Sequence, residues 1–216
     1  LDEEAVKSAA AGCNYIFNLA GIADLDDATT KPLKTLELNV KGNLNIMEAA
    51  LQAPAKRYVY ASTIYVYSQK GGFYRCSKQA SEIYIEEYHN RYGLDYTILR
   101  YGTLYGPRAD NRNSIYRYLK QALEDNIIHC DGTGDEMRDY IHVRDAARLS
   151  VDVLSEEYRN QHIIISGQHT MRFRDMLLMI KEITGKDMEI KFSNKKNDDH
   201  YAYTPYSYAP KIGSKL

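Results

Sequence analysis

The sequence has little that would indicate a secreted, membrane-spanning or metal-binding protein. It contains no tryptophan and only three cysteines in 216 residues. The odd number and wide spacing of Cys13, Cys76 and Cys130 argue against a disulfide framework or a metal site, and favour buried free thiols in a reducing compartment. No apolar run approaches the roughly 18 residues that cross a bilayer, and no secretion signal is visible. We therefore predict a cytoplasmic protein.

Strong charge of either sign is also absent. Lysine and arginine number 28 against 29 aspartates and glutamates, so the formal net charge is -1. This balance gives no electrostatic reason to expect nucleic acid or a membrane surface as a partner. Tyrosine is abundant, with 20 residues against four phenylalanines. Many tyrosines must therefore pack in the core, and a catalytic role for any one of them needs further support.

Apolar runs of strand length alternate with amphipathic segments of helix length, which is typical of βαβ units and a parallel sheet. The pattern predicts strands at residues 14–19, 57–61, 95–101 and 161–166. It predicts helices at residues 31–52, 74–91, 112–125 and 172–184, and another that begins near 144. Residues 131–135 form a turn cluster, residues 194–200 a solvated loop, and residues 210–216 the start of a helix.

A glycine-rich phosphate loop is missing from this pattern. A nucleotide-binding α/β sheet normally opens with a strand, a G-x-G-x-x-G loop and a helix. The 13 glycines form no such array, and residue 1 is Leu rather than Met. We interpret the fold class as α/β, a Rossmann-like doubly wound parallel sheet whose first βαβ portion is missing. We expect this chain alone to have low stability and to bind a dinucleotide cofactor poorly.

The strongest local signal for chemistry is Y-R-C-S-K at residues 74–78, at the head of a predicted helix. Residues four apart share a helix face, so the Tyr74 phenol and the Lys78 ammonium point into one space. A nearby cation lowers the pKa of a phenol, which suits a general acid/base. A structural alternative is that Tyr74 packs in the core and Lys78 lies at the edge of the core, with no catalytic role. From this motif alone, the structural alternative is favoured.

The neighbouring strand changes that balance. The predicted strand at residues 57–61 is followed directly by Ser62 and Thr63, at the carboxyl edge where open α/β sheets bind ligands. A hydroxyl there could hold a substrate oxygen during proton transfer, although it could also cap the following turn. The position of Ser62 and Thr63 at the strand end, together with their order before Tyr74 and Lys78, favours a catalytic role over turn capping alone.

Six segments follow one another along the chain: N-L-A-G at 18–21, N-V-K-G-N-L-N at 39–45, S-T-I-Y-V-Y at 62–67, Y-R-C-S-K at 74–78, L-R-Y-G-T-L-Y-G-P-R at 99–108 and M-R-D-Y-I-H-V-R-D-A at 137–146. In this order they resemble the motifs of the extended short-chain dehydrogenase/reductases of the NAD-dependent epimerase/dehydratase group. The resemblance covers nearly the whole chain, so it implies a fold and an activity rather than a single shared motif.

The resemblance implies specific roles for these positions. Tyr74 would be the acid/base, Lys78 would tune it and bind the nicotinamide ribose, and Thr63 would hydrogen-bond the reacting sugar hydroxyl. The cofactor would be NAD, with NADP not excluded. Its lining residues would be Ala20, Gly21, Asn39, Ala61, Tyr74, Lys78 and Tyr101. The substrate-binding residues would be Thr63, Thr103 and Arg138, with Arg138 at the pyrophosphate.

The resemblance also implies an organisation. Residues 1–105, with return segments near 141–166, would form the cofactor-binding Rossmann portion. Residues 106–140 and 167–216 would form the substrate-binding region. A homodimer would form through the helices at 31–52 and 74–91, with a stripe of Leu38, Gly42 and Ile46 compatible with that interface.

The residues directly after Thr63 indicate which reaction of this family to expect. Sugar dehydratases and decarboxylases of this kind usually carry an acidic residue after the catalytic threonine, and Ile64 and Tyr65 stand here instead. The expectation is therefore a nucleotide-sugar epimerase, similar to UDP-glucose 4-epimerase, in polysaccharide precursor synthesis. A nucleotide 4-ketosugar reductase is the close alternative, and a non-catalytic nucleotide-binding module is the alternative of another class.

Overall fold

The computed structural model describes residues 2–193 and 200–208. The chain divides into two compact units. The first unit comprises Leu1–Arg100, Val151–Ile164 and Pro205–Leu216, and the second comprises Tyr101–Ser150 and Ile165–Thr204. The predicted loop at 194–200 and the predicted helix start at 210–216 lie almost entirely outside the described residues.

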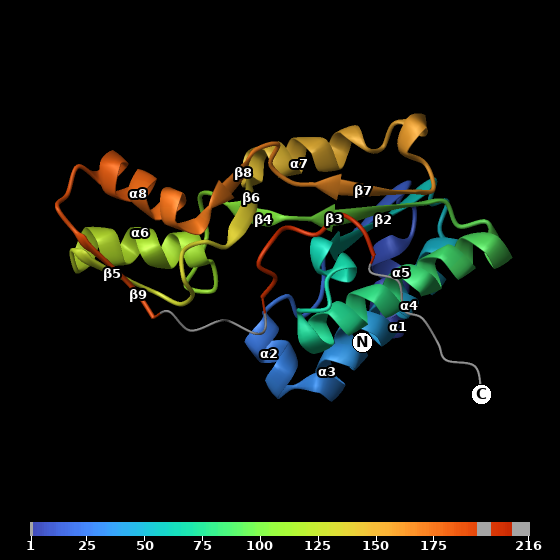
Figure 1. Cartoon of the computed structure of the whole chain (residues 1–216). Helices are drawn as coiled ribbons and strands as arrows, with labels where there is room; N and C mark the ends of the chain where they lie inside the picture. The colour runs from blue at the N-terminus through green and yellow to red at the C-terminus, as the bar shows by residue number, and fades with distance from the viewer. Residues whose placement is uncertain (1, 194–199, 209–216) are drawn as a thin grey trace, which may run out of the picture. The chain divides into compact units, whose positions relative to one another are not determined.

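The first unit is built on a four-stranded sheet in the order β1-β2-β3-β7 (Figure 1). The strands are β1 (Tyr15–Asn18), β2 (Arg57–Thr63), β3 (Tyr96–Tyr101) and β7 (Gln161–Ile165). β1 and β2 are parallel, with Tyr15 opposite Arg57. The four predicted strands are therefore confirmed, and the prediction of an α/β fold with a parallel sheet is confirmed with them.

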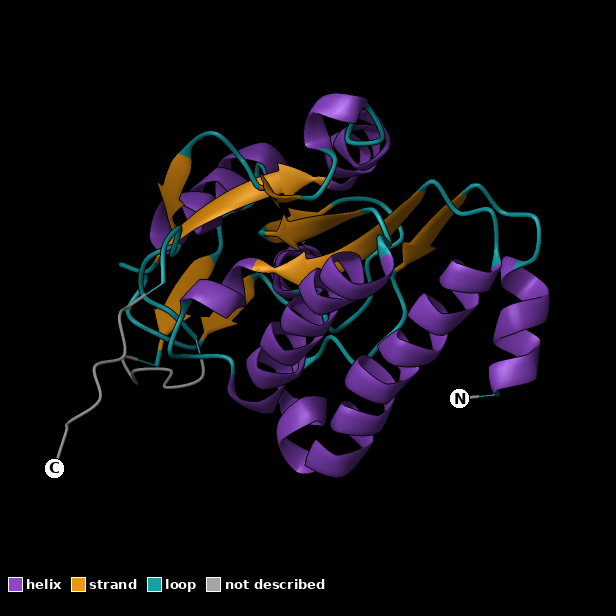
Figure 2. Cartoon of the chain, turned by 90° about the vertical axis from the view of Figure 1, so that its right-hand side faces the viewer, coloured by secondary structure: helices purple, strands orange, loops and turns teal. Residues whose placement is uncertain are grey.

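The long helices of the first unit cover one side of this sheet, and Figure 2 shows them running side by side along the strands. The helical segments of this unit are α1 (Glu3–Ala10), α2 (Leu25–Thr30), α3 (Pro32–Leu36), η1 (Glu37–Lys41), α4 (Gly42–Gln52), η2 (Ile64–Tyr67), α5 (Gly72–Tyr92) and η3 (Glu156–Tyr158). α4 and α5 meet β2 and β3 through a buried cluster that includes Met47, Tyr60, Ile85 and Ile98. α5 ends at Gly93, whose φ of 71° is a left-handed cap that favours glycine.

The predicted helix at 31–52 is not one regular α-helix. Its middle turn, η1, is a π-helix that carries Asn39, and α3 and α4 flank it. A π-turn inserts one residue into the helix and rotates the next side chains, and it is frequent at functional sites. Here it lets the Asn39 carbonyl accept a hydrogen bond from the Ser81 hydroxyl at 2.9 Å, which links this helix to α5.

The second unit contains shorter elements. Its strands are β4 (Thr103–Tyr105), β5 (Ile127–Cys130), β6 (Met137–His142), β8 (Thr170–Arg172) and β9 (Glu189–Phe192). Its helices are α6 (Ser114–Glu124), α7 (Val143–Asp152, whose last two residues are counted with the first unit) and α8 (Phe173–Thr184). β4, β6 and β8 form one sheet, and β5 pairs in parallel with β9. α6 and α8 enclose a core around Ile128 and Leu177.

Two smaller expectations can be compared with the structure. Cys130 is a buried free thiol as predicted, whereas Cys76 is exposed and Cys13 is partly exposed, so the prediction of burial is wrong for Cys76. Cys76 lies between Tyr74 and Lys78 on the outer side of α5, which explains its exposure. Among the described residues, no helix combines the length and the apolar character that a membrane span requires.

Candidate active site

The Tyr74 and Lys78 side chains are buried together at the start of α5, beside the end of β2. Lys78 Nζ donates a hydrogen bond of 2.7 Å to the Ala61 carbonyl oxygen. The same ammonium lies 4.7 Å from the centroid of the Tyr60 ring and 5.9 Å from that of the Tyr74 ring. The i,i+4 spacing thus places phenol and ammonium on one helix face, directed at the strand, as the sequence indicates.

Thr63 joins this pair as the last residue of β2. Its side chain is buried and hydrogen-bonded to the Tyr74 phenol. Thr63 Oγ1 also accepts a hydrogen bond from the Tyr65 backbone N–H at 3.3 Å, at the start of η2. The hydroxyl thus caps the following turn, as the structural interpretation expects, and also meets the phenol, while its role in holding a substrate oxygen stays a prediction.

The protonation of the pair differs from the sequence-based expectation in one respect. Burial, which disfavours the phenolate, raises the pKa of Tyr74 to about 12, and the hydrogen bond from Thr63 acts in the opposite direction. Burial also lowers the pKa of Lys78 to about 8, against the charge of Glu82, which raises it. The expected lowering of the Tyr74 pKa by Lys78 is wrong for this structure, because the ammonium is bonded to Ala61 and the phenol is dry.

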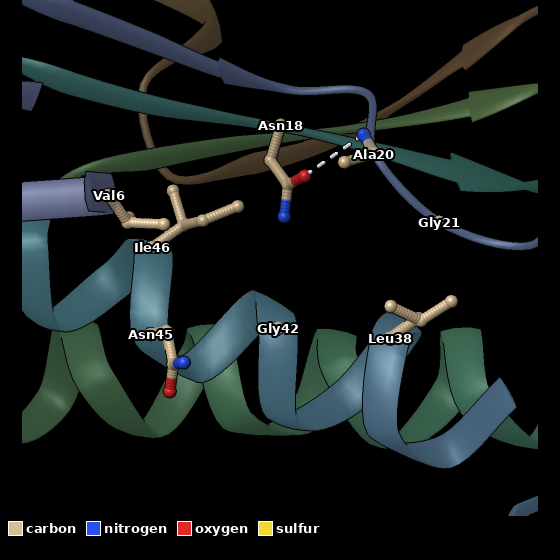
Figure 3. A pocket seen from close by; sticks show the side chains of 8 residues that line it. All are labelled: Val6, Asn18, Ala20, Gly21, Leu38, Gly42, Asn45 and Ile46. Atoms are coloured by element: carbon tan, nitrogen blue, oxygen red, sulfur yellow. Dashed lines mark hydrogen bonds between the residues drawn. The ribbon is translucent and has the colours of Figure 1, made fainter. Parts of the chain in front are cut away.

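A cavity of about 260 Å³ lies beyond the carboxyl end of β1 (Figure 3). Asn18, Ala20 and Gly21 line it on the strand side, and Asn18 Oδ1 accepts a hydrogen bond of 3.1 Å from the Ala20 backbone N–H. The other lining residues come from α1 and the η1–α4 helix: Val6, Leu38, Gly42, Asn45 and Ile46. Ala20 and Gly21, two of the predicted cofactor-lining residues, thus lie at an open, mostly apolar cavity.

The same cavity corrects the interpretation of the stripe on this helix. Leu38, Gly42 and Ile46 face the cavity together with Val6 of α1 (Figure 3). They were expected to be compatible with an outer interface between two copies of the chain. The stripe lies instead on the inner side of the helix, toward β1, because α1 packs along α4 there.

Asn39 holds the loop that follows β1. Its Oδ1 accepts a hydrogen bond from the Ile22 backbone N–H at 2.7 Å, and its Nδ2 donates to the Ile22 carbonyl and to Ser77 Oγ, both at 2.9 Å. Gly21, with a φ of 150°, passes so close that a Cβ there would lie 2.6 Å from Asn39 Oδ1. Asn39 is a predicted cofactor-lining residue, and its amide oxygen and both amide hydrogens form hydrogen bonds inside the chain.

The remaining predicted site residues lie at the beginning and in the sheet of the second unit. The Tyr101 hydroxyl meets Ser150 Oγ at 2.6 Å. Thr103 is hydrogen-bonded to the side chain of Tyr201, and the Arg138 guanidinium lies 4.4 Å above the centroid of the same ring. Tyr201 therefore brings Thr103 and Arg138 together, a contact that no sequence motif indicated.

Three further residues near Lys78 escaped the sequence analysis. Tyr60 lies under the ammonium, and Glu82 and Arg100 form a buried ion pair with a 2.6 Å contact between Nη2 and Oε2. A signal was present in the sequence, because Arg100 interrupts an apolar strand and a buried charge requires a partner. Glu82, one turn after Lys78 on the same helix, is the partner that the spacing offered.

A parallel α/β sheet with a tyrosine and a lysine one helical turn apart, beside a hydroxyl at the end of the neighbouring strand, defines a short-chain dehydrogenase/reductase. Residues 1–166 match the model of the NAD dependent epimerase/dehydratase family. The chain belongs to that family, an extended branch of the short-chain dehydrogenase/reductases.

Individual relatives are similar over most of this chain. It is 27% identical to a UDP-glucuronate 4-epimerase of Thermodesulfobacterium geofontis, covering 91% of this chain and 65% of that protein. It is 24% identical to a dTDP-glucose 4,6-dehydratase of Streptomyces antibioticus, covering 98% of this chain and 68% of that protein. The structure of a UDP-glucose 4-epimerase from Thermotoga maritima, with UDP-glucose, superposes with a TM-score of 0.86 at 25% identity, covering 96% and 73%. The chain thus spans about two thirds of the length of these curated relatives.

Proposed function

We propose that this protein is a nucleotide-sugar epimerase that inverts carbon 4 of a UDP-sugar with the help of NAD. The observation that carries the proposal is the convergence of Thr63, Tyr74 and Lys78 at the end of β2. The similarity to 4-epimerases that act on UDP-glucuronate and UDP-glucose supports the substrate class.

The residues around this convergence favour epimerisation over dehydration. Elimination of water from a sugar requires an acid that protonates the departing hydroxyl. The backbone turns directly after Thr63 into η2, whose residues are Ile64, Tyr65, Val66 and Tyr67. This segment carries no carboxylate, although dehydratases are among the relatives of the chain.

The described residues fit NAD at its ribose and nicotinamide end. Ala20 and Gly21 present backbone without bulky side chains at the cavity beyond β1, and the Lys78 ammonium and the Tyr74 phenol stand at the adjacent strand end. These residues, with the Ala61 backbone, would hold that half of the cofactor. When bound, NAD supplies a hydride acceptor and donor for the sugar carbon.

The chain's own groups handle the proton and the orientation of the sugar. The Thr63 hydroxyl would hold the sugar hydroxyl that reacts. Tyr74, which is hydrogen-bonded to Thr63, would first release its own phenol proton to solvent, and its phenolate oxygen would then take the proton of the sugar hydroxyl and later return it. The Lys78 ammonium, 5.9 Å from the centroid of the Tyr74 ring, would be the positive charge that favours this phenolate, although burial is the larger influence on the Tyr74 pKa. In the second unit, Arg138 and Thr103 would contact the nucleotide phosphates, since a guanidinium fork matches phosphate oxygens.

The same proposal assigns one ligand to each unit and includes a homodimer. The first unit would bind the cofactor and the second the sugar nucleotide. A homodimer would form through the outer faces of α3 and α5, where Leu33, Leu36, Ile83 and Tyr84 are exposed. Exposed apolar side chains are favoured positions for such an interface. The expectation of a cytoplasmic location stays a prediction.

An assay of the purified protein with a panel of UDP-, GDP-, CDP- and dTDP-sugars, without added reduced cofactor, tests the proposal. Separation of the products should show two UDP-sugars interconverting with no net consumption of cofactor. Turnover only with a 4-ketosugar and NADPH would replace the epimerase by a reductase. Nucleotide binding without any turnover would indicate a non-catalytic module.

A further inference from the structure

The guanidinium of Arg138 on β6 lies on an aromatic ring from much later in the chain. Its Cζ atom is 4.4 Å from the centroid of the Tyr201 ring, within the range of a cation–π contact. Arg138 Nη1 donates hydrogen bonds to the carbonyl oxygens of Met137, at 2.8 Å, and Ala202, at 3.4 Å. The Met137 backbone N–H donates to the same Ala202 oxygen at 2.8 Å. Residues 201 and 202 are therefore in contact with the first two residues of β6.

The Tyr201 ring is held in place from a second strand as well. Tyr201 is only 7% exposed, and its side chain is hydrogen-bonded to Thr103, the first residue of β4. β4 pairs in parallel with β6, where Thr103 lies opposite Tyr140. Tyr201 thus contacts two neighbouring strands of one sheet, which fixes the ring against the Arg138 guanidinium.

The contacts of Arg138 leave one edge of its guanidinium available. Nη1 bonds to the two backbone carbonyls, whereas Nε and Nη2 form no hydrogen bond or ion pair with any residue that the structure describes. The attraction of a cation to an aromatic face uses none of its N–H groups. Two free N–H groups of a guanidinium match two oxygens of a phosphate. The described surroundings of Arg138 therefore suit an anion with several oxygens.

We propose that Tyr201 is a positioning residue of the nucleotide site, whose ring supports the Arg138 guanidinium so that Nε and Nη2 together meet the diphosphate of the sugar nucleotide. Tyr201 does not touch the reacting atoms of the sugar, and it acts through Arg138. This role rests on the proposed function, which assigns Arg138 to the phosphates. It concerns the binding of the nucleotide, so it can be measured separately from turnover.

Titration of the purified chain tests this role, followed by calorimetry for UDP and by NMR for uridine, a weaker ligand that lacks phosphate. Tyr201→Leu removes the ring and should weaken UDP binding about 5- to 30-fold, the order of one well-formed cation–π contact. Uridine binding should stay unchanged, because only the phosphates meet Arg138. Tyr201→Phe keeps the ring and should restore most of the UDP affinity. The matched control is Tyr203→Leu, at a position that is 72% exposed, which should bind UDP as the wild type does.

A measurement on the wild type keeps the test valid if Tyr201→Leu fails to fold. In NMR spectra of the arginine Nε–H groups, the Arg138 signal is assigned by its absence in Arg138→Gln. This signal should move on addition of UDP and stay in place with uridine, and the Arg138 side chain should keep its nuclear Overhauser contacts with the Tyr201 ring when UDP is bound.

Several results would overturn the proposal: an unchanged UDP affinity in folded Tyr201→Leu, an equal loss of uridine affinity, or an equal loss of UDP affinity in Tyr203→Leu. An Arg138 signal that UDP does not move, loss of the contact with the Tyr201 ring in the complex, or absence of UDP binding by the wild type would also overturn it. UDP binding without turnover of any UDP-sugar would contradict the proposed epimerase and leave the role of Tyr201 standing.

Discussion

Replacement of Lys78 by methionine should remove a distinct pH dependence from the stability of the protein. Burial lowers the pKa of Lys78 from 10.5 to about 8. Each pH unit corresponds to about 1.4 kcal/mol. Retention of the charged ammonium therefore costs the folded state about 3 kcal/mol at neutral pH. Methionine fills a similar volume and carries no charge, so this cost disappears in Lys78→Met.

The sign of the pH dependence follows from which state holds the proton. Between pH 8 and 10.5 the unfolded chain keeps Lys78 protonated while the folded chain has released its proton. A rise in pH through this window therefore favours the folded state. From pH 7 to 9.5 the free energy of unfolding of the wild type should gain about 2 kcal/mol relative to Lys78→Met.

Urea unfolding followed by circular dichroism, at half-unit steps from pH 7 to 9.5, measures this difference. The comparison between the two proteins cancels the titration of the other groups, including the tyrosines, which begin to ionise in the unfolded chain near the upper limit. Parallel stability curves for wild type and Lys78→Met would refute the reasoning, because Lys78 would then titrate alike in the folded and unfolded chains.

Two further predictions concern packing. Gly21→Ala should destabilise the protein by about 1–3 kcal/mol in urea unfolding. The new Cβ would lie 2.6 Å from Asn39 Oδ1 and displace the hydrogen bond that this oxygen accepts from Ile22. Wild-type stability in this variant would show that Asn39 does not hold the loop. Leu177→Ala should cost about 3–5 kcal/mol in thermal or urea unfolding, because this fully buried side chain fills the core between α6 and α8. Leu178→Ala, at an exposed neighbour on α8, is the matched control and should change stability by less than about 1 kcal/mol.

The sequence predicted the elements that position the site because their patterns are long and regular. The apolar spacing of residues 31–52 and the strand-length runs at 57–61 and 95–101 correspond to helices and strands of the structure. Tyr74 and Lys78 could be paired because helix periodicity alone brings residues four apart together. Thr63 could be added because the carboxyl ends of parallel strands meet at one edge.

Other features of the site depend on contacts that no local pattern contains. Asn39, in the π-turn, donates hydrogen bonds to Ile22 and Ser77, which are far away in the sequence. The short strands β4, β5 and β8 are only three or four residues long, too short for a period-two signal. Tyr201 approaches Arg138 across more than sixty positions, and one tyrosine among 20 carries no sign of that role.

The central claim is that Tyr74 exchanges the proton of the sugar hydroxyl, and Tyr74→Phe tests it most directly. The variant keeps the ring and its packing and removes only the phenol oxygen. The rate of interconversion of the UDP-sugar pair should fall by at least about 100-fold, the order that a general acid/base contributes. Tyr92→Phe, at an exposed position of the same helix, should keep the wild-type rate. An unchanged rate in folded Tyr74→Phe would contradict the account.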